Sequence, residues 1–492
     1  MRRRVASRLV AGLAGGAVLA ACSSAPAPTS LVQDGGTTGG LTAGGTPVRG
    51  AVGGTVPGTP GGTTGTAPAT RGGSSTGAQA PGTGPAVPGT TGGSTGGTSG
   101  AVAPARTTLF TPAEDRIGIT PTSLTMCAHA ALTYGQAFGT KDSDFNVYWQ
   151  ALNTEKGGIF GRKVSVSYEN DNYTPTDAVK AATACKAKNP FMLLGGIGFD
   201  QIPAVRNWAD ANHMLYLHHS ATVQGSQGKK YSFTELPTVE RLGEGFAQLA
   251  VAKYKGKRIG IIERDSSNWA PGVQAFKAMA KKAGLTIVAD KAVATNKANY
   301  TDELTAMRNA KADVVWVWLN ALESTQLIKQ SKVQQFSPNW LMFPFNLTSQ
   351  TLDGDAMTPP LDGVAMYPAY SQGDYSGSFA PYASDMKEFE RQYRQYDPDV
   401  DLSGIGGDLL FLNWTAQKAL HVQLLQCGKD CTRNRFVDVL LGYTGQSPGK
   451  TACPIDFRGD GHHGSDSVVF MQTYRAASGK VNWRNTAACV RP

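Results

Sequence analysis

From about residue 116 onward, short apolar runs alternate with longer segments whose apolar residues recur every three or four positions. The short runs suit buried strands, and the longer segments suit amphipathic helices. Near-regular alternation of this kind predicts parallel sheets with helices on both faces. Strands are expected at residues 116–119, 164–169, 191–195, 214–218, 258–263, 285–289, 313–318 and 340–344. Helices are expected at residues 145–153, 176–188, 202–212, 239–254, 270–283, 301–310 and 322–333.

The pattern changes after Tyr367. Helices are expected at residues 379–396 and 407–426, and short antiparallel strands at 454–483. About 375 residues are too many for one core, so two lobes are predicted. Ligands of doubly wound sheets bind at the carboxyl ends of the strands, which makes the loops that follow the strands the candidate binding loops.

The first 21 residues have the layout of an export signal. Four arginines precede an apolar run at residues 9–21, which is too short to span a bilayer as a permanent helix. The segment Leu19-Ala20-Ala21-Cys22 resembles the bacterial lipobox, in which the cysteine is acylated and becomes the new N-terminus. The alternative is an ordinary signal peptide with an incidental cysteine. The lipobox predicts a lipid-anchored protein on the outer, extracytoplasmic face of the cell membrane.

Residues 22–112 are predicted to be a disordered tether. They are mostly Gly, Thr, Pro, Ala and Ser, and no aromatic residue precedes Phe110. Such a segment cannot bury enough apolar surface to offset its ordering entropy. A flexible coil of about 90 residues has a mean span of roughly 50 Å. The Thr, Pro and Ser bias also fits an O-glycosylated stalk, which composition alone does not decide.

Net charge does not indicate a nucleic-acid partner. Removal of residues 1–21 takes away four arginines and no acids, which lowers the formal net charge from +9 to +5. No run of Lys and Arg interleaved with aromatic residues follows. Nucleic acid is therefore not expected among the partners.

Six cysteines remain when Cys22 is set aside, and an even number in an exported domain favours disulfides. Six cysteines allow fifteen pairings, which the sequence does not decide. The expected pairs are Cys127–Cys185, Cys427–Cys431 and Cys453–Cys489; the second would close a tight loop after a long helix. The competing interpretation is a metal site. It is weak because no Cys-x-x-Cys occurs and adjacent histidines on a strand point to opposite faces.

A family resemblance is carried by one short segment. The residues Asn153-Thr-Glu-Lys-Gly157-Gly158-Ile159-Phe-Gly161-Arg162 resemble the Asn-x-x-Gly-Gly-Ile-x-Gly-Arg signature of type I periplasmic binding proteins, with one extra residue before the glycine pair. The resemblance is to the branched-chain amino-acid-binding (Leu/Ile/Val-binding) family of ABC-transporter receptors. Residues 255–262 and 455–461 resemble the start of that family's second lobe and a turn near its end.

This resemblance implies an α/β clamshell of two doubly wound parallel-sheet lobes joined by a three-crossover hinge. The first lobe would contain residues 113–237 and 368–450, and the second lobe residues 238–367 and 451–492. Ligand would bind between the lobes and shift the open–closed equilibrium toward the closed form, which a membrane permease then recognises. No bond is made or broken, so the protein is not expected to be an enzyme.

The resemblance also directs attention to the binding loops. Ser220 and Thr222 match a hydroxyl-rich loop that holds the carboxylate of amino-acid ligands in the family. Trp269 would stack on a flat or apolar ligand, and Glu323 would bind an ammonium group. Ordinary loop and capping roles are the alternative for each residue. The candidate ligand-binding residues are Tyr134, Asp200, Ser220, Thr222, Trp269, Asn320, Glu323 and Phe345.

The sequence thus predicts a lipid-anchored solute-binding receptor that delivers a small polar solute to the permease subunits of an ABC importer. The expected solute is an amino acid, an amide or a related small organic acid. The alternative is the same clamshell used as a sensor or cell-envelope interaction lipoprotein without transport. An enzyme on this fold is a third class, which no catalytic motif supports. No cofactor and no metal are expected.

Overall fold

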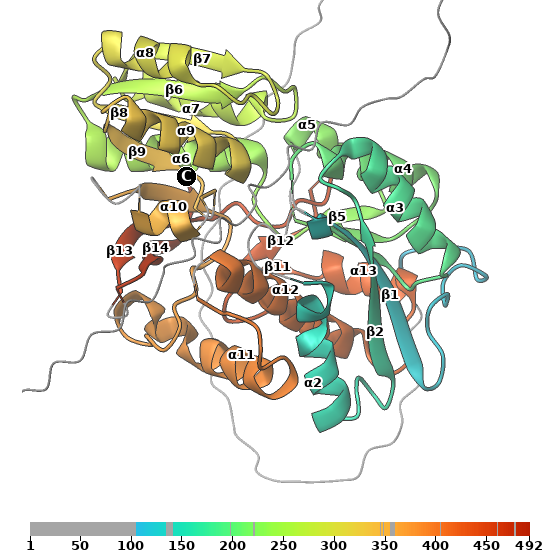
Figure 1. Cartoon of the computed structure of the whole chain (residues 1–492). Coiled ribbons are helices and arrows are strands. Elements are labelled where there is room, and N and C mark those ends of the chain that lie inside the picture. Colours follow the sequence, from blue (N-terminus) through green and yellow to red (C-terminus); the bar gives the residue numbers. More distant parts are fainter. Residues whose placement is uncertain are drawn as a thin grey trace, which may run out of the picture. The chain divides into compact units, whose positions relative to one another are not determined.

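The computed structural model describes residues 105–133, 141–196, 198–219, 222–344, 346–347, 349–354, 360–403, 405–459, 461–476 and 479–492. Two sheets organise this part of the chain (Figure 1). None of the described helices is both long enough and apolar enough to cross a membrane. We call the five-stranded sheet with its helices the first lobe, and the seven-stranded sheet with its helices the second lobe.

The first lobe is built on a parallel sheet with the strand order β2-β1-β3-β4-β5. This order reverses between β1 and β3, and such a switch point is where doubly wound folds bind ligands. The strands are β1 (Ser123–Ala130), β2 (Lys163–Asn170), β3 (Leu193–Gly195), β4 (Tyr216–His218) and β5 (Ser232–Thr234).

The second lobe repeats this topology with additions. Its strand order is β14-β13-β10-β9-β8-β6-β7, parallel from β7 to β10 and antiparallel at β13 and β14. The switch point of the parallel part lies between β6 and β8. The strands are β6 (Arg258–Arg264), β7 (Thr286–Val293), β8 (Val314–Trp318), β9 (Asn339–Met342), β10 (Asp362–Ala365), β13 (Val468–Arg475) and β14 (Val481–Val490).

The helices follow the strands in the predicted alternation, and several begin at a side-chain cap. Thr174, Thr238 and Thr432 each accept a hydrogen bond from a backbone N–H of the first turn. First-lobe helices are α2 (Val147–Glu155), α3 (Pro175–Ala187), α4 (Gln201–Ala211), α5 (Val223–Ser226), α11 (Ala383–Tyr396), α12 (Ile405–Cys427) and α13 (Arg433–Leu441). Second-lobe helices are α6 (Val239–Tyr254), α7 (Ala270–Lys282), α8 (Thr301–Asn309), α9 (Ala321–Val333) and α10 (Ser349–Gly354). Short elements complete the set: the 3₁₀ helices η1 (Asp142–Asn146) and η2 (Gly377–Tyr382), and the strands β11 (Thr444–Gln446) and β12 (Ile455–Asp456).

The chain passes between the lobes three times. The passages follow β5, β10 and β12, so the last helices of the first lobe come late in the sequence. Figure 1 shows the result: the orange α11 lies beside the teal α2, although more than 200 residues separate them. The type I periplasmic binding protein architecture implied by the resemblance is therefore present. The precise domain boundaries remain a prediction.

The first predicted strand was wrong. Residues 116–118 lie in a turn, Ile119 forms an isolated antiparallel bridge with Leu124, and β1 begins at Ser123. Gly118 has a φ of +79°, and a Cβ atom built there would lie 2.0 Å from the backbone nitrogen of Phe191. Only glycine fits at this close contact with the backbone of Phe191. The Arg-Ile-Gly-Ile run therefore forms a turn here and not a strand. The actual strand was missed because its sequence includes polar residues.

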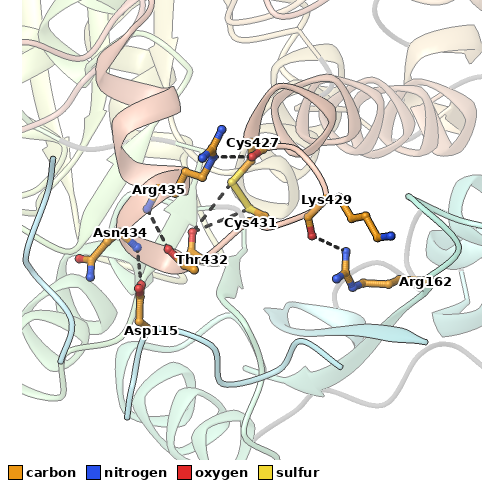
Figure 2. The surroundings of a disulfide bond; sticks show 8 residues. All are labelled: Asp115, Arg162, Cys427, Lys429, Cys431, Thr432, Asn434 and Arg435. Carbon is orange, nitrogen blue, oxygen red and sulfur yellow. Dashed lines mark hydrogen bonds between the residues drawn. A yellow bond between two sulfur atoms is a disulfide. The ribbon is translucent and has the colours of Figure 1, made fainter. Parts of the chain in front are cut away.

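The three disulfides are the expected pairs. Cys127 is bonded to Cys185, Cys427 to Cys431, and Cys453 to Cys489. Figure 2 shows the surroundings of the second bond, where Arg435 donates a hydrogen bond of 2.7 Å to the carbonyl of Cys427.

Figure 2 also shows what Arg162 of the signature segment does. Its Nη1 donates to the carbonyl oxygen of Lys429 at 2.8 Å. Its Nε donates to the carbonyl oxygen of Thr120, which the figure does not draw, at 2.7 Å. One guanidinium thus holds the loop before β1, the loop after α2 and the disulfide loop after α12 together. In this chain Arg162 therefore has a structural role.

Candidate ligand-binding site

The two lobes contact each other through Asp200, the N-cap residue of α4. Its Oδ1 accepts hydrogen bonds from the hydroxyl of Ser266 at 2.7 Å and the amide of Asn268 at 3.2 Å. Its Oδ2 accepts a hydrogen bond of 3.1 Å from the indole Nε1 of Trp269. All three donors follow β6 of the second lobe. Asp200 and Trp269, two residues predicted to bind ligand, therefore bind each other.

Phe199 adds an apolar contact at the same place. Its ring centroid lies 4.9 Å from that of Trp269 and 5.6 Å from that of Trp318. The Trp318 indole in turn donates a hydrogen bond of 3.0 Å to the carbonyl of Trp269. Trp269 and Trp318 are nearly fully buried. The loop after β3 thus contacts residues beside the switch point of the second sheet.

Arg264, at the end of β6, connects these groups. Its Nη1 lies 3.4 Å from Asp200 Oδ2, and its Nε lies 3.7 Å from Glu323 Oε1. Its guanidinium carbon lies 5.4 Å from the centroid of the Trp269 ring. The side chain is 5% exposed. A buried guanidinium needs such partners, because an unpaired buried charge is strongly destabilising.

Asn320 and Glu323 form a capping box at the start of α9. The Asn320 side chain accepts a hydrogen bond from the Glu323 N–H at 2.9 Å, and the Glu323 carboxylate accepts from the Asn320 N–H at 3.1 Å. Glu323 also accepts from the backbone N–H of Asn296 at 2.7 Å. These bonds give both residues structural roles; ligand contact by either one stays a prediction.

Of the remaining predicted residues, Thr222 is the one that the structure describes. Thr222 caps the short helix α5, where its hydroxyl accepts a hydrogen bond of 2.9 Å from the Gly225 N–H. Tyr134, Ser220 and Phe345 lie outside the described residues, as does Cys22.

A cavity of about 170 Å³ opens in the first lobe. The carboxyl ends of β1, β3 and β4 form one wall, and one side of α12 forms another. All three passages between the lobes reach it, through Glu235, Tyr367 and Ser465. The cavity therefore lies at the switch point between β1 and β3, where the topology of the first sheet predicts a ligand.

His129 at the end of β1 is held from both sides. Its Nδ1 lies 2.9 Å from Asp171 Oδ2, and its Nε2 lies 2.7 Å from the hydroxyl of Tyr216. All three side chains are buried. Burial raises the pKa of Tyr216 well above its usual value, so this phenol keeps its proton and both ring nitrogens of His129 have partners.

Two further titratable groups line the cavity. Burial raises the pKa of Glu235 to about 7, although a hydrogen bond from the amide of Gln423 opposes the shift. Burial, together with the charge of His129, lowers the pKa of His219 to about 4. Near neutral pH the cavity therefore has an uncharged imidazole and a carboxyl group that is partly protonated.

The sequence interpretation missed Phe199, Arg264, His129 and Glu235. Phe199 directly precedes a residue that was chosen, and Arg264 ends a strand that was predicted correctly. Both could have been found by considering every residue at the end of a strand, or in the loop that follows it, as a candidate. His129 was missed because the first strand was misplaced by several residues.

Comparison with known proteins supports the same fold. The family described as periplasmic binding protein matches residues 145–479. No curated protein matches the chain.

Solved structures resemble it at low identity. The fatty acid ABC transporter substrate-binding protein from Thermomonospora curvata has a TM-score of 0.61 and 14% identity, covering 76% of this chain and 94% of its own. A solute-binding protein of an ABC transporter from Rhodopseudomonas palustris BisB5, in complex with 3,4-dihydroxybenzoic acid, has a TM-score of 0.60 and 13% identity, covering 75% and 99%. A branched-chain amino acid ABC transporter protein from Thermus thermophilus with bound valine has a TM-score of 0.59 and 14% identity, covering 76% and 98%.

At such identities the solved structures establish the fold and not the ligand. The family match is broader, since it spans more than half of the chain and includes parts of both lobes. The chain belongs to the periplasmic binding protein family and has the type I fold of ABC-transporter substrate-binding proteins.

Proposed function

We propose that this protein is a lipid-anchored, extracytoplasmic receptor that captures a small organic solute and delivers it to an ABC importer. It performs no covalent step. One observation carries the proposal: the cavity at the β1/β3 switch point is lined by all three passages between the lobes. A solute there touches the segments whose backbone must rotate when the lobes move, so its binding energy can bias the open–closed equilibrium.

The relatives support a solute receptor without naming the solute. Their ligands include an aromatic acid and valine, and one is described as a fatty acid transporter protein. An amino acid, an amide or a small organic acid is the class that the sequence predicts. Such a ligand at the interlobe contact would have to displace Asp200 from its donors.

Lipid anchoring at Cys22 and a long tether complete the proposal. A receptor confined to the membrane surface stays close to the permease and is not lost to the medium. The tether also favours a second candidate function, that of a sensor or cell-envelope interaction lipoprotein, because a receptor that serves an adjacent permease needs little reach.

A melting-temperature screen of the mature protein tests binding. Amino acids, amides, aromatic acids and their neutral analogues are the compounds to use. A ligand that binds only the folded state raises stability by about 2.7 kcal/mol at one hundred times its Kd. Solute uptake by cells that lack the gene then separates transport from sensing. The receptor proposal fails if no solute of any class shifts the melting temperature.

A further inference from the structure

The walls of the first-lobe cavity are mainly hydrocarbon. Leu409, Leu412, Ala416 and Leu420 of α12 face it. Their spacing of three or four residues places them on one side of the helix. Opposite them lie Leu194 of β3 and other strand-end residues. Apolar surface of this kind gains free energy when a hydrocarbon group replaces water.

The size of the cavity limits its occupant. Apolar protein cavities of about 150 Å³ bind benzene. A cavity of about 170 Å³ therefore has room for one aromatic ring with a small substituent, or for a short branched chain.

The cavity offers no cation to an anionic ligand. None of the described lining residues is Lys or Arg. Any charge on His129 is balanced by Asp171 at 2.9 Å, and His219 is uncharged near neutral pH. Glu235 adds negative charge whenever it ionises. A carboxylate buried here would be unpaired, which costs several kcal/mol.

Gln417, a polar residue of the lining, has an atom without a hydrogen-bond partner among the described residues. Gln417 is 4% exposed, and its Nε2 donates hydrogen bonds to the carbonyl of Phe145 at 2.7 Å and to the hydroxyl of Tyr168 at 3.3 Å. The carbonyl acceptor fixes which end of the amide carries the N–H groups. The other end, Oε1, is buried and has no hydrogen-bond partner among the described residues. Because Gln417 lines the cavity, a ligand toward which this side chain turns can supply the missing donor.

We infer that the first-lobe cavity binds an uncharged, mainly hydrocarbon solute with one hydroxyl or N–H donor, which bonds to Gln417 Oε1. The inference rests on the proposed receptor function and names its solute class. A small phenol or alcohol has the required chemistry: an apolar body for the leucine wall, a donor for the glutamine, and no charge to leave unpaired.

Calorimetric titration of the mature protein with four probes tests this. The probes are 4-methylphenol, toluene, benzoate and L-leucine. We expect 4-methylphenol to bind at least tenfold more tightly than benzoate, which differs chiefly in its charge, and more tightly than toluene, which lacks the donor. The Gln417→Leu variant should bind 4-methylphenol and toluene equally.

A second variant keeps the test valid if Gln417→Leu fails to fold. Ala416→Leu adds three carbon atoms at the α12 wall and should weaken 4-methylphenol binding at least tenfold. The matched control Ala306→Leu on α8 of the second lobe should leave binding unchanged. Tighter binding of benzoate or leucine that Ala416→Leu does not alter overturns the inference and leaves the receptor function intact. No binding of these four probes overturns the inference alone; the receptor function fails only if the wider screen is also negative.

Discussion

The carboxylate of Asp200, at the start of α4 in the first lobe, accepts a hydrogen bond of 3.1 Å from the indole nitrogen of Trp269 in the second lobe. Ser266, Asn268 and Arg264 approach the same carboxylate. This one side chain therefore supplies most of the polar contacts at this interlobe junction. Hydrogen bonds to a charged group contribute about 1.5–3 kcal/mol each, and they are lost together when the carboxylate is removed.

Asp200→Ala is therefore expected to shift the equilibrium toward open lobes. A change of about 2 kcal/mol alters the open–closed ratio roughly thirtyfold. Small-angle X-ray scattering should show a larger radius of gyration, and the fluorescence of Trp269 should change as its indole becomes exposed.

Asp210→Ala is the matched control for this experiment. Asp210 lies at the other end of α4 and accepts a hydrogen bond from the Lys230 N–H, within the first lobe. This variant should keep the scattering profile of the wild type. An unchanged profile for Asp200→Ala would show that the contact does not hold the lobes together.

Replacement of the buried Arg264 is expected to lower the stability of the protein. Arg264→Met removes the cation from between Asp200 and Glu323, and Glu323 is 3% exposed. Loss of one partner of a buried ion pair costs about 3 kcal/mol. The double variant Arg264→Met/Glu323→Gln should recover part of this loss, because the buried side chain at position 323 then has no charge that lacks a partner. Urea unfolding of both single variants and the double variant measures the coupling energy, and additive losses would contradict the pairing.

Sequence patterns predicted most of the fold because its elements obey local rules. The helix expected at residues 239–254 is α6, since Thr238 caps it and apolar residues repeat on one face. Residues 116–119 were misassigned because the contact between Gly118 and Phe191 joins segments over 70 residues apart. No local pattern reveals a contact at that distance.

The candidate site was less predictable than the fold for a related reason. Asp200 and Trp269 were chosen because they follow strands, but the sequence did not show that they bind each other, and their contact with a ligand stays a prediction. Gln417 and Leu412 lie on a helix that the sequence places well, in a lobe completed only after the chain has returned from the second one. Which face of α12 borders a cavity depends on that return. The periodicity of the helix does not indicate it, because apolar residues occur on all of its faces.

Cys22→Ala is expected to release the protein or to mislocalise it. The thiol is the proposed acylation site, and without a lipid the roughly 90-residue tether has nothing to hold it at the membrane. Fractionation of cells should find the variant in the soluble fraction. Solute affinity of the purified variant should equal that of the wild type, and a lower affinity would show that the tether and the binding lobes are not independent.

The three disulfides are expected to differ in their contributions. In the chain-entropy model the stabilisation grows with the length of the closed loop. Cys127–Cys185 spans 58 residues and Cys427–Cys431 spans 4. Removal of the first pair as Cys127→Ala/Cys185→Ala should cost about 4 kcal/mol, and Cys427→Ala/Cys431→Ala should cost clearly less. Guanidinium unfolding of the two variants checks the order, and a reversed order would mean that native-state packing outweighs loop entropy.

Glu235 is expected to make the protein less stable as the pH rises from 5 to 8. Its pKa is raised to about 7 in the folded state because the carboxyl group is buried, whereas the unfolded chain has the ordinary value near 4.5. Between these values the folded state holds a proton that the unfolded state does not, so the stabilisation is complete below about pH 4.5 and is lost as the pH rises to 7. The shift corresponds to at most about 3 kcal/mol, and partial exposure of the side chain reduces this.

Glu235→Gln has no proton to lose, so the difference in unfolding free energy between pH 5 and pH 8 should be smaller for this variant than for the wild type. Urea titrations at the two pH values measure both differences, and equal differences would show that Glu235 ionises normally in the folded protein.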